Sequence, residues 1–167
     1  MEKEEKEMTA LFAPDYLEEY EGPSIFLAGP TIRVRASRDI TRWRRQALNL
    51  FQMYKYEGNV FFPEQAPGGK YDYDKERQYE WEDFHLNAAS CILFWIPREL
   101  KLLPGFTTNI EWGKWHDSGK VVLGHPPDAP KMSWINFDAH RHFVPIEDQL
   151  GDAIQTAIAM SGRLVEP

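Results

Sequence analysis

The sequence contains a single cysteine, Cys91, which lies in the apolar segment 91–96. One cysteine excludes a disulfide within the chain, and its apolar neighbours predict a buried core residue. The chain also has no apolar run near the roughly 20 residues that a membrane-spanning helix needs. Residues 1–8, rich in glutamate and lysine, lack the apolar segment of a signal peptide. We therefore expect a cytoplasmic protein without a membrane partner.

Positive charge is also scarce, because 19 lysine and arginine residues face 26 aspartate and glutamate residues, for a net charge of −7. This balance argues against a nucleic-acid polymer as partner and favours small molecules. Hydrophobic residues make up 43% of the 167 residues, which suits one globular domain. We expect a charged extension over residues 1–23, which ends at Gly22 and Pro23, and a single domain over residues 24–167.

Strand-like and helix-like segments alternate along that domain. Short apolar runs predict strands, and apolar residues at helical spacing predict helices. The expected strands cover residues 24–28, 60–62, 91–96 and 121–123, with a possible fifth at 133–137. The expected helices cover residues 39–56, 75–89, 108–118 and 146–160. This alternation predicts an α/β fold with a doubly wound sheet of four to five mainly parallel strands flanked by helices. In the first helix, we expect Arg42, Arg44 and Arg45 to face solvent.

A ligand cleft is expected where the first and third of these strands end, because neighbouring loops of a doubly wound sheet diverge there. Gly29 and Pro30 follow the first strand, and the missing Cβ of Gly29 would allow a ligand to approach closely. Across the cleft, a helix starting at Thr108 and Asn109 offers free backbone N–H groups. Glu111 is then expected to project from the first turn of that helix.

Five blocks resemble, in order, the nucleoside 2-deoxyribosyltransferase family. They are Ile-Phe-Leu-Ala-Gly-Pro-Thr at 25–31, Trp-Glu at 81–82, Phe-Trp-Ile-Pro at 94–97, Thr-Thr-Asn-Ile-Glu-Trp-Gly at 107–113 and Gly-Lys-Val-Val at 119–122. The resemblance implies a flavodoxin-like subunit, a homo-oligomer in which a neighbouring chain completes the pocket, and cleavage of an N-glycosidic bond without a metal or other cofactor. It also implies that Glu111 is the nucleophilic glutamate of a Glu-x-Gly pattern.

The chemistry of this reaction requires carboxyl groups. Breaking the bond between deoxyribose and a base develops oxocarbenium character at the anomeric carbon, which a carboxylate can stabilise and then trap covalently. A second carboxyl group can protonate the leaving base. Glu82 is our candidate for that proton donor, and Asp83 is the alternative. Consecutive helical residues differ by about 100° in direction, so both should not face the cleft.

Other residues are candidates for contacts with a deoxynucleoside or a free nucleobase. Thr108, Asn109 and Glu64 are expected to contact substrate, whereas Phe26 and Tyr71 are expected to stack on the base. The spacing of Thr108 and Glu111 also fits a capping box, which would be a structural role.

A metal site is not expected, and two alternative functions remain open at the level of sequence. Glu82, Asp83 and His85 match no standard zinc motif, so we expect no metal there. A hydrolase, in which water replaces the acceptor base, could use the same scaffold. A nucleotide-binding module without catalysis is the second alternative.

Overall fold

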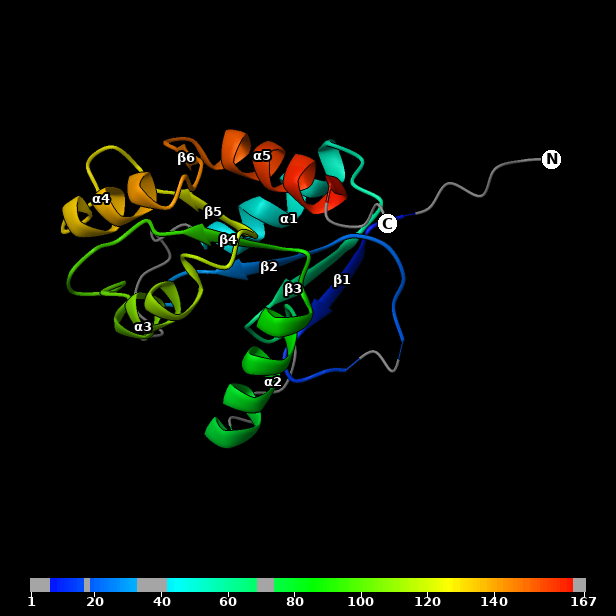
Figure 1. Cartoon of the computed structure of the whole chain (residues 1–167). Helices are drawn as coiled ribbons and strands as arrows, with labels where there is room; N and C mark the ends of the chain where they lie inside the picture. The colour runs from blue at the N-terminus through cyan, green and yellow to red at the C-terminus, as the bar shows by residue number, and fades with distance from the viewer. Residues whose placement is uncertain (1–6, 17–18, 33–41, 69–73, 164–167) are drawn as a thin grey trace.

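The structure, a computed structural model, describes residues 7–16, 19–32, 42–68 and 74–163. Its strands form one sheet in the order β1-β3-β2-β4-β5-β6, and every neighbouring pair is parallel (Figure 1). The strand bounds are β1 Thr9–Phe12, β2 Ser24–Ala28, β3 Asn59–Phe62, β4 Cys91–Trp95, β5 Val121–Gly124 and β6 Ile146–Glu147. The expected α/β, flavodoxin-like arrangement is confirmed, with six strands among the described residues in place of four to five.

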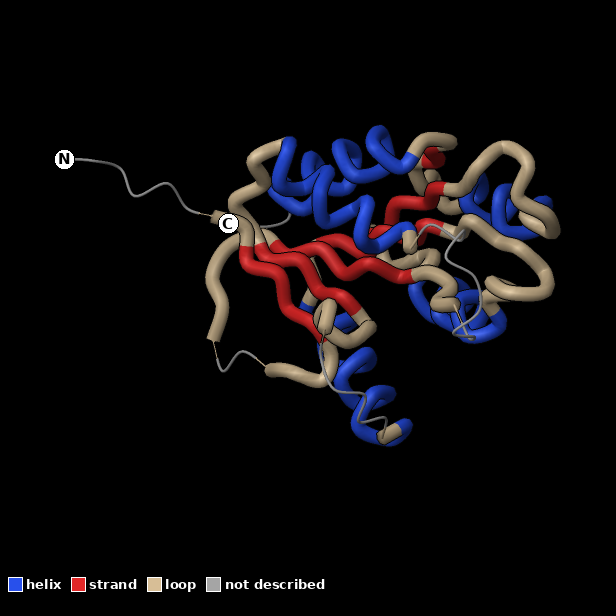
Figure 2. The backbone as a smooth tube through the Cα atoms, turned by 180° about the vertical axis from the view of Figure 1, so that it is seen from behind, coloured by secondary structure: helices blue, strands red, loops and turns tan. Residues whose placement is uncertain are grey.

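Helices cover both faces of this sheet. Their bounds are α1 Trp43–Met53, α2 Lys75–Ala88, α3 Phe106–Trp115, α4 Ser133–Arg141 and α5 Leu150–Arg163. Helices α1 and α5 pack on one face, and buried residues of α2, α3 and α4 belong to the core on the other face. Figures 1 and 2 show the sheet between these layers. In the described ranges, no helix has the length and apolarity that crossing a bilayer requires.

The central strands β2 and β4 are buried at every position. Alternate residues enter opposite cores: Phe26 and Ile92 pack towards α2 and α3, whereas Leu27 and Cys91 pack towards α1 and α5. Burial on both faces explains why these strands appear as continuous apolar runs in the sequence. The prediction that Cys91 is a core residue is confirmed, and burial raises the pKa of its thiol to about 12.

Three predicted elements differ in the structure. Part of the expected charged extension is β1, whose Thr9 lies opposite Asn59 of β3. The predicted strand at 133–137 is wrong, because this segment belongs to α4. Its buried residues, Ile135 and Ala139, are four apart, which is a helical spacing. The predicted helix at 146–160 is instead the short strand β6 followed by α5 from Leu150.

Gly29 allows the end of β2 to pass close to β4. Its φ of 147° favours glycine, and an added Cβ would lie 2.1 Å from the carbonyl oxygen of Trp95 and 2.9 Å from Cζ2 of Trp43. We predict that Gly29→Ala lowers the free energy of unfolding by about 3 kcal/mol, because backbone must move to relieve the clash. Chemical denaturation measures this change.

Gly113→Ala is the matched control for that prediction. A Cβ at Gly113 meets nothing within 4 Å, and the position lies inside α3. Alanine should therefore be neutral there or stabilise the helix by about 1 kcal/mol. Equal effects of the two substitutions would contradict the proposed packing constraint at Gly29.

Candidate active site

A cleft of about 1230 Å³ lies where β2, β3 and β4 end. Strands β2 and β4 are neighbours, and the helices that follow them, α1 and α3, pack on opposite faces of the sheet. This divergence is the topological switch point at which doubly wound folds bind ligands. The cleft is lined by the loops after β2 and β3 and by side chains of α1, α2 and α3. Among the charged side chains that line it, Glu64, Glu82 and Glu111 interact electrostatically with Arg44.

The guanidinium of Arg44 connects several of the loops around the cleft. Its Nε donates to the carbonyl oxygen of Leu27 at 3.1 Å, and its Nη2 donates to that of Gly29 at 2.7 Å. Its Nη1 donates to Oγ1 of Thr31 at 2.9 Å and lies 3.4 Å from Oε2 of Glu64. One side chain of α1 thus holds the loop after β2 and pairs with the loop after β3.

The prediction that Arg44 faces solvent is wrong, because the residue is only 3% exposed. Arg42 and Arg45 are exposed as expected. The buried face of α1 is formed by Trp43, Ala47 and Phe51, and Arg44 lies within this face. Its three-residue spacing from Ala47 is a signal that sequence reasoning missed, because residues at i and i+3 share a helix face.

Glu111 and Glu82 form a pair of carboxyl groups in this cleft. Burial and then the charge of Glu82 raise the pKa of Glu111 to about 8, although Arg44 opposes this shift. Burial also raises the pKa of Glu82, opposed by a hydrogen bond from Gln78 and by the charge of Arg44. The two carboxyl groups thus interact with each other and share one cation.

Gln78 orients Glu82. Its side-chain amide donates to Oε1 of Glu82 at 2.8 Å and to the carbonyl oxygen of Pro63 at 3.1 Å, so α2 is connected to the loop after β3. Asp83, the alternative proton donor, lies outside the cleft, where its Oδ1 is 2.5 Å from Nζ of the exposed Lys114. Of these two neighbouring acids, the structure therefore brings Glu82 to the cleft with Glu111.

The capping-box interpretation of Thr108 and Glu111 is wrong. Helix α3 begins at Phe106 with Gly105 as N-cap, and no side chain caps it. Gly105 has a φ of 69°, a left-handed conformation that favours glycine. Glu111 consequently lies in the second turn of α3, not in the first. Thr108 is 2% exposed and lines the cleft as expected.

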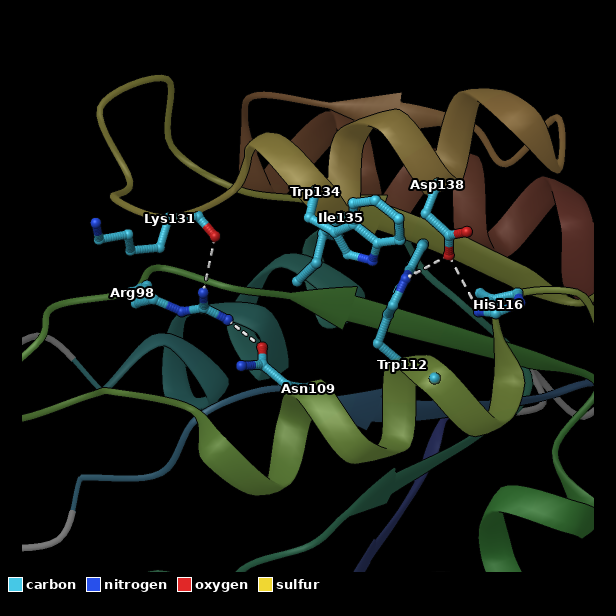
Figure 3. Close-up of a pocket in the computed structure, with 9 residues that line it drawn as sticks. Arg98, Asn109, Trp112, His116, Lys131, Trp134, Ile135 and Asp138 are labelled. Carbon is cyan, nitrogen blue, oxygen red and sulfur yellow. Dashed lines mark hydrogen bonds and ion pairs between the residues drawn. The ribbon is translucent and has the colours of Figure 1, made fainter.

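Two predicted contact residues do not face the cleft. Phe26 is fully buried beside Trp81, with ring centroids 6.1 Å apart, so it cannot stack on a nucleobase. Its position in β2 directs it into the core under α2. Asn109 instead lines a separate cavity of about 310 Å³ between α3 and α4, where its Oδ1 accepts a hydrogen bond from Arg98 (Figure 3). Tyr71 lies outside the described residues.

Gly29, Pro30 and Glu64 line the cleft as predicted, but each also makes a contact within the protein that the sequence did not predict. Gly29 lines it, but the space of the missing Cβ is filled by Trp95, not left for a ligand. Pro30 also lines the cleft, and its carbonyl oxygen accepts a hydrogen bond of 3.0 Å from Nε1 of Trp43. Glu64 lines the cleft as the partner of Arg44.

Glu82, Asp83 and His85, which are close in sequence and could suggest a metal site, point in different directions. Glu82 faces the cleft, and Asp83 is exposed beside Lys114. His85 is buried, and its Nδ1 lies 2.8 Å from the carbonyl oxygen of Trp81. These side chains therefore do not form one coordination site.

Comparison of the sequence with models of known protein families identifies the family of this chain. The sequence model described as nucleoside 2-deoxyribosyltransferase like matches residues 22–129. The chain belongs to the nucleoside 2-deoxyribosyltransferase-like family. The matched segment includes Arg44, Glu82 and Glu111, three charged residues that line the cleft.

A solved structure is similar to this deoxyribosyltransferase-like chain in fold. It is the crystal structure of a conserved protein from Enterococcus faecalis V583, with a TM-score of 0.55 and 12% sequence identity. The similarity covers 83% of this chain and 98% of that one. At this identity the likeness concerns the fold alone. No curated protein matches the chain.

The raised pKa of Glu111 has a consequence for the stability of this deoxyribosyltransferase-like chain. Between the ordinary value of 4.5 and about 8, the folded state keeps a proton that the unfolded state releases. The stability that this proton provides is present below pH 4.5 and is lost as pH rises through 8. We predict that Glu111→Gln, which is neutral at every pH, becomes increasingly more stable than wild type across this window. The upper limit is on the order of 5 kcal/mol, at about 1.36 kcal/mol per pKa unit.

Urea denaturation at a series of pH values measures this difference. Glu80→Gln is the control, because Glu80 is an exposed glutamate on α2, and its pH dependence should match that of wild type. A stability difference for Glu111→Gln that does not grow from pH 4.5 to 8 would show that Glu111 lacks the desolvation and the charged neighbour described.

Proposed function

We propose that this chain is a cytoplasmic enzyme that transfers 2-deoxyribose between nucleobases, with Glu111 as nucleophile and Glu82 as proton donor. The observation that carries the proposal is the pair of interacting, half-buried carboxyl groups at the switch-point cleft. Membership of the nucleoside 2-deoxyribosyltransferase-like family supports the choice of substrate class. Deoxynucleosides and free nucleobases are the proposed ligands, and the steps below need no cofactor.

In the first half-reaction, the bond between the anomeric carbon and the base nitrogen breaks, and its electron pair leaves with the base. Glu82 gives its proton to the departing base, and a carboxylate oxygen of Glu111 bonds to the anomeric carbon. In the second half-reaction, a nitrogen of the acceptor base attacks that carbon, and Glu111 leaves as a carboxylate. The acceptor returns a proton to Glu82. Two inversions retain the configuration of the sugar.

The electrostatics of the cleft favour a single proton shared by Glu111 and Glu82, as the reaction requires. The reaction requires one ionised carboxylate and one protonated carboxyl group, so the pair must hold a single proton. The raised pKa values of Glu111 and Glu82 favour retention of a proton, whereas Arg44 favours one negative charge. As positive charge develops at the anomeric carbon, ionised Glu111 becomes favoured, which leaves the proton for Glu82.

Glu64 and Thr108 are the proposed contacts for substrate hydroxyl groups. Glu64 is held by Arg44, yet its side chain is 29% exposed, so its carboxylate can still accept a hydrogen bond. Thr108 also lines the cleft, one turn before Glu111 on α3. Thr108 is on α3, which carries Glu111. Glu64 is in the loop after β3, which Gln78 connects to Glu82.

We predict that Glu111→Ala stays folded and loses base exchange by at least roughly 1000-fold, because the covalent route disappears. The assay mixes a deoxynucleoside with a second free base and follows the new deoxynucleoside by chromatography. Glu82→Gln should slow exchange by roughly 100-fold or more, since its amide cannot donate a catalytic proton. Asp83→Asn is the matched control on the adjacent position and should exchange nearly as wild type.

The same assay separates the other functions. A folded Glu111→Ala variant with wild-type exchange would refute the nucleophile assignment. Release of free deoxyribose without exchange would identify a hydrolase. Binding of deoxynucleosides without any turnover in the wild type would identify a nucleotide-binding module.

We also propose a homo-oligomer in which a second copy completes the pocket. Ile110 neighbours Glu111 on α3 and is 74% exposed, and Trp134, Phe137 and Phe143 add exposed apolar surface elsewhere. Such surface on a folded chain favours association. We predict that Ile110→Asp shifts the sedimentation coefficient towards monomer and reduces exchange.

The control is Met53→Asp, which alters a residue that is 65% exposed on α1. It should leave both the assembly and the exchange rate unchanged. A wild-type protein that sediments only as monomer at assay concentration, yet exchanges bases, would contradict the shared pocket.

A further inference from the structure

Three potential metal ligands lie together where α3 and α4 end, outside the lining of the catalytic cleft. His116 is the C-cap residue of α3, His142 is the C-cap residue of α4, and Asp138 lies one turn before His142. Nδ1 of His116 is 3.0 Å from Oδ2 of Asp138, and Nδ1 of His142 is 3.4 Å from Oδ1. One ligand atom from each residue lies within 4.8 Å of the others.

The electrostatic surroundings of this cluster favour a cation. The C-terminus of a helix carries a partial negative charge of roughly half an elementary charge, and two helices end here. The carboxylate of Asp138 adds a full negative charge, with only 13% of its side chain exposed. In the described part of the chain, no lysine or arginine forms an ion pair with Asp138. Lys114 on α3 pairs with Asp83, and Arg141 on α4 lies over the ring of Phe137.

Hydrogen bonds hold the carboxylate in place and leave ring nitrogens available. Nε1 of Trp112 donates to Oδ2 of Asp138 at 2.9 Å (Figure 3). Such a second bond orients a metal ligand and fixes its geometry. Nδ1 of His142 lies 2.8 Å from the backbone oxygen of Asp138, which leaves its Nε2 for another partner.

Hydrogen bonding within the cluster does not account for the position of the His116 ring. Its Nδ1 is buried and makes no hydrogen bond, although a carboxylate oxygen is only 3.0 Å away. Two ligand atoms that are each about 2.0–2.1 Å from a tetrahedral metal lie roughly 3.3 Å apart. The separation of Nδ1 and Oδ2 is therefore close to that of two ligands sharing one ion.

We propose that His116, Asp138 and His142 bind a divalent transition-metal ion, with zinc as its representative. Two imidazoles and one carboxylate suit zinc and its neighbours, whereas calcium and magnesium prefer oxygen ligands. The cavity of about 310 Å³ between α3 and α4 is lined by His116 and Asp138, which gives room for water as a fourth ligand (Figure 3).

The bound ion joins the ends of two helices. Helix α3 also carries Glu111, five residues before His116, so the ion restrains the helix that holds the proposed nucleophile. The ion's role is structural, and the site is independent of the chemistry in the cleft. Sequence spacing does not reveal it, because His116 and Asp138 belong to different helices and meet only in the folded chain.

Zinc binding to the untagged full chain tests the proposal. The protein is treated with EDTA, dialysed and titrated with zinc chloride in a calorimeter. We expect one ion per chain, and affinity at least roughly tenfold weaker in His116→Ala and His142→Ala. His140→Ala is the matched control, because His140 is exposed on the same helix and lies outside the cluster. It should bind zinc as wild type does.

Cobalt(II) provides a second readout that does not depend on activity. It should give visible absorption bands with wild type and with His140→Ala, but not with His142→Ala. His142 is an exposed side chain, so this variant should remain folded, which circular dichroism checks. The proposal is overturned if wild type binds no zinc at roughly 100 μM. Equal zinc affinity in the His140, His142 and His116 variants would also overturn it.

Discussion

The buried guanidinium of Arg44 is the charge around which the cleft is organised. Removing a guanidinium from water is costly, and burial lowers its pKa accordingly. Carbonyl oxygens at the end of β2 and just after it, and the carboxylates of Glu64, Glu111 and Glu82, offset that cost. The same hydrogen bonds and ion pair hold the segments after β2 and β3 against α1. The arrangement of the candidate site and its electrostatics therefore depend on one side chain.

This arrangement explains how two glutamates on different helices can have different roles. One cation beside two half-buried carboxyl groups stabilises one negative charge better than two, so the pair retains a proton. Gln78 donates a hydrogen bond to Glu82, whereas α3 places Glu111 beyond the loop that follows β4. In the proposed mechanism, the acid and the nucleophile are distinguished by where the substrate's charge develops, not by residue type.

The sequence predicts the layers of this fold well because its central strands are buried on both faces and helices α1 and α5 have clear apolar periods. It also predicts the place of Glu111, since the end of β4 lies at the switch point. It does not predict Arg44, whose burial depends on carbonyl oxygens that only folding brings together. Phe26 and Asn109 fail for a related reason. The direction of a side chain depends on strand alternation or helix phase, and an error of one residue moves it to another face.

Isolation of the covalent intermediate tests the central claim most directly. The protein is mixed with a deoxynucleoside without an acceptor base, quenched in acid, digested and analysed by mass spectrometry. The account predicts a deoxyribosyl adduct on Glu111 in the wild type and none in Glu111→Gln. Release of base without any adduct, or an adduct on Glu82 with Glu111 unmodified, would contradict it.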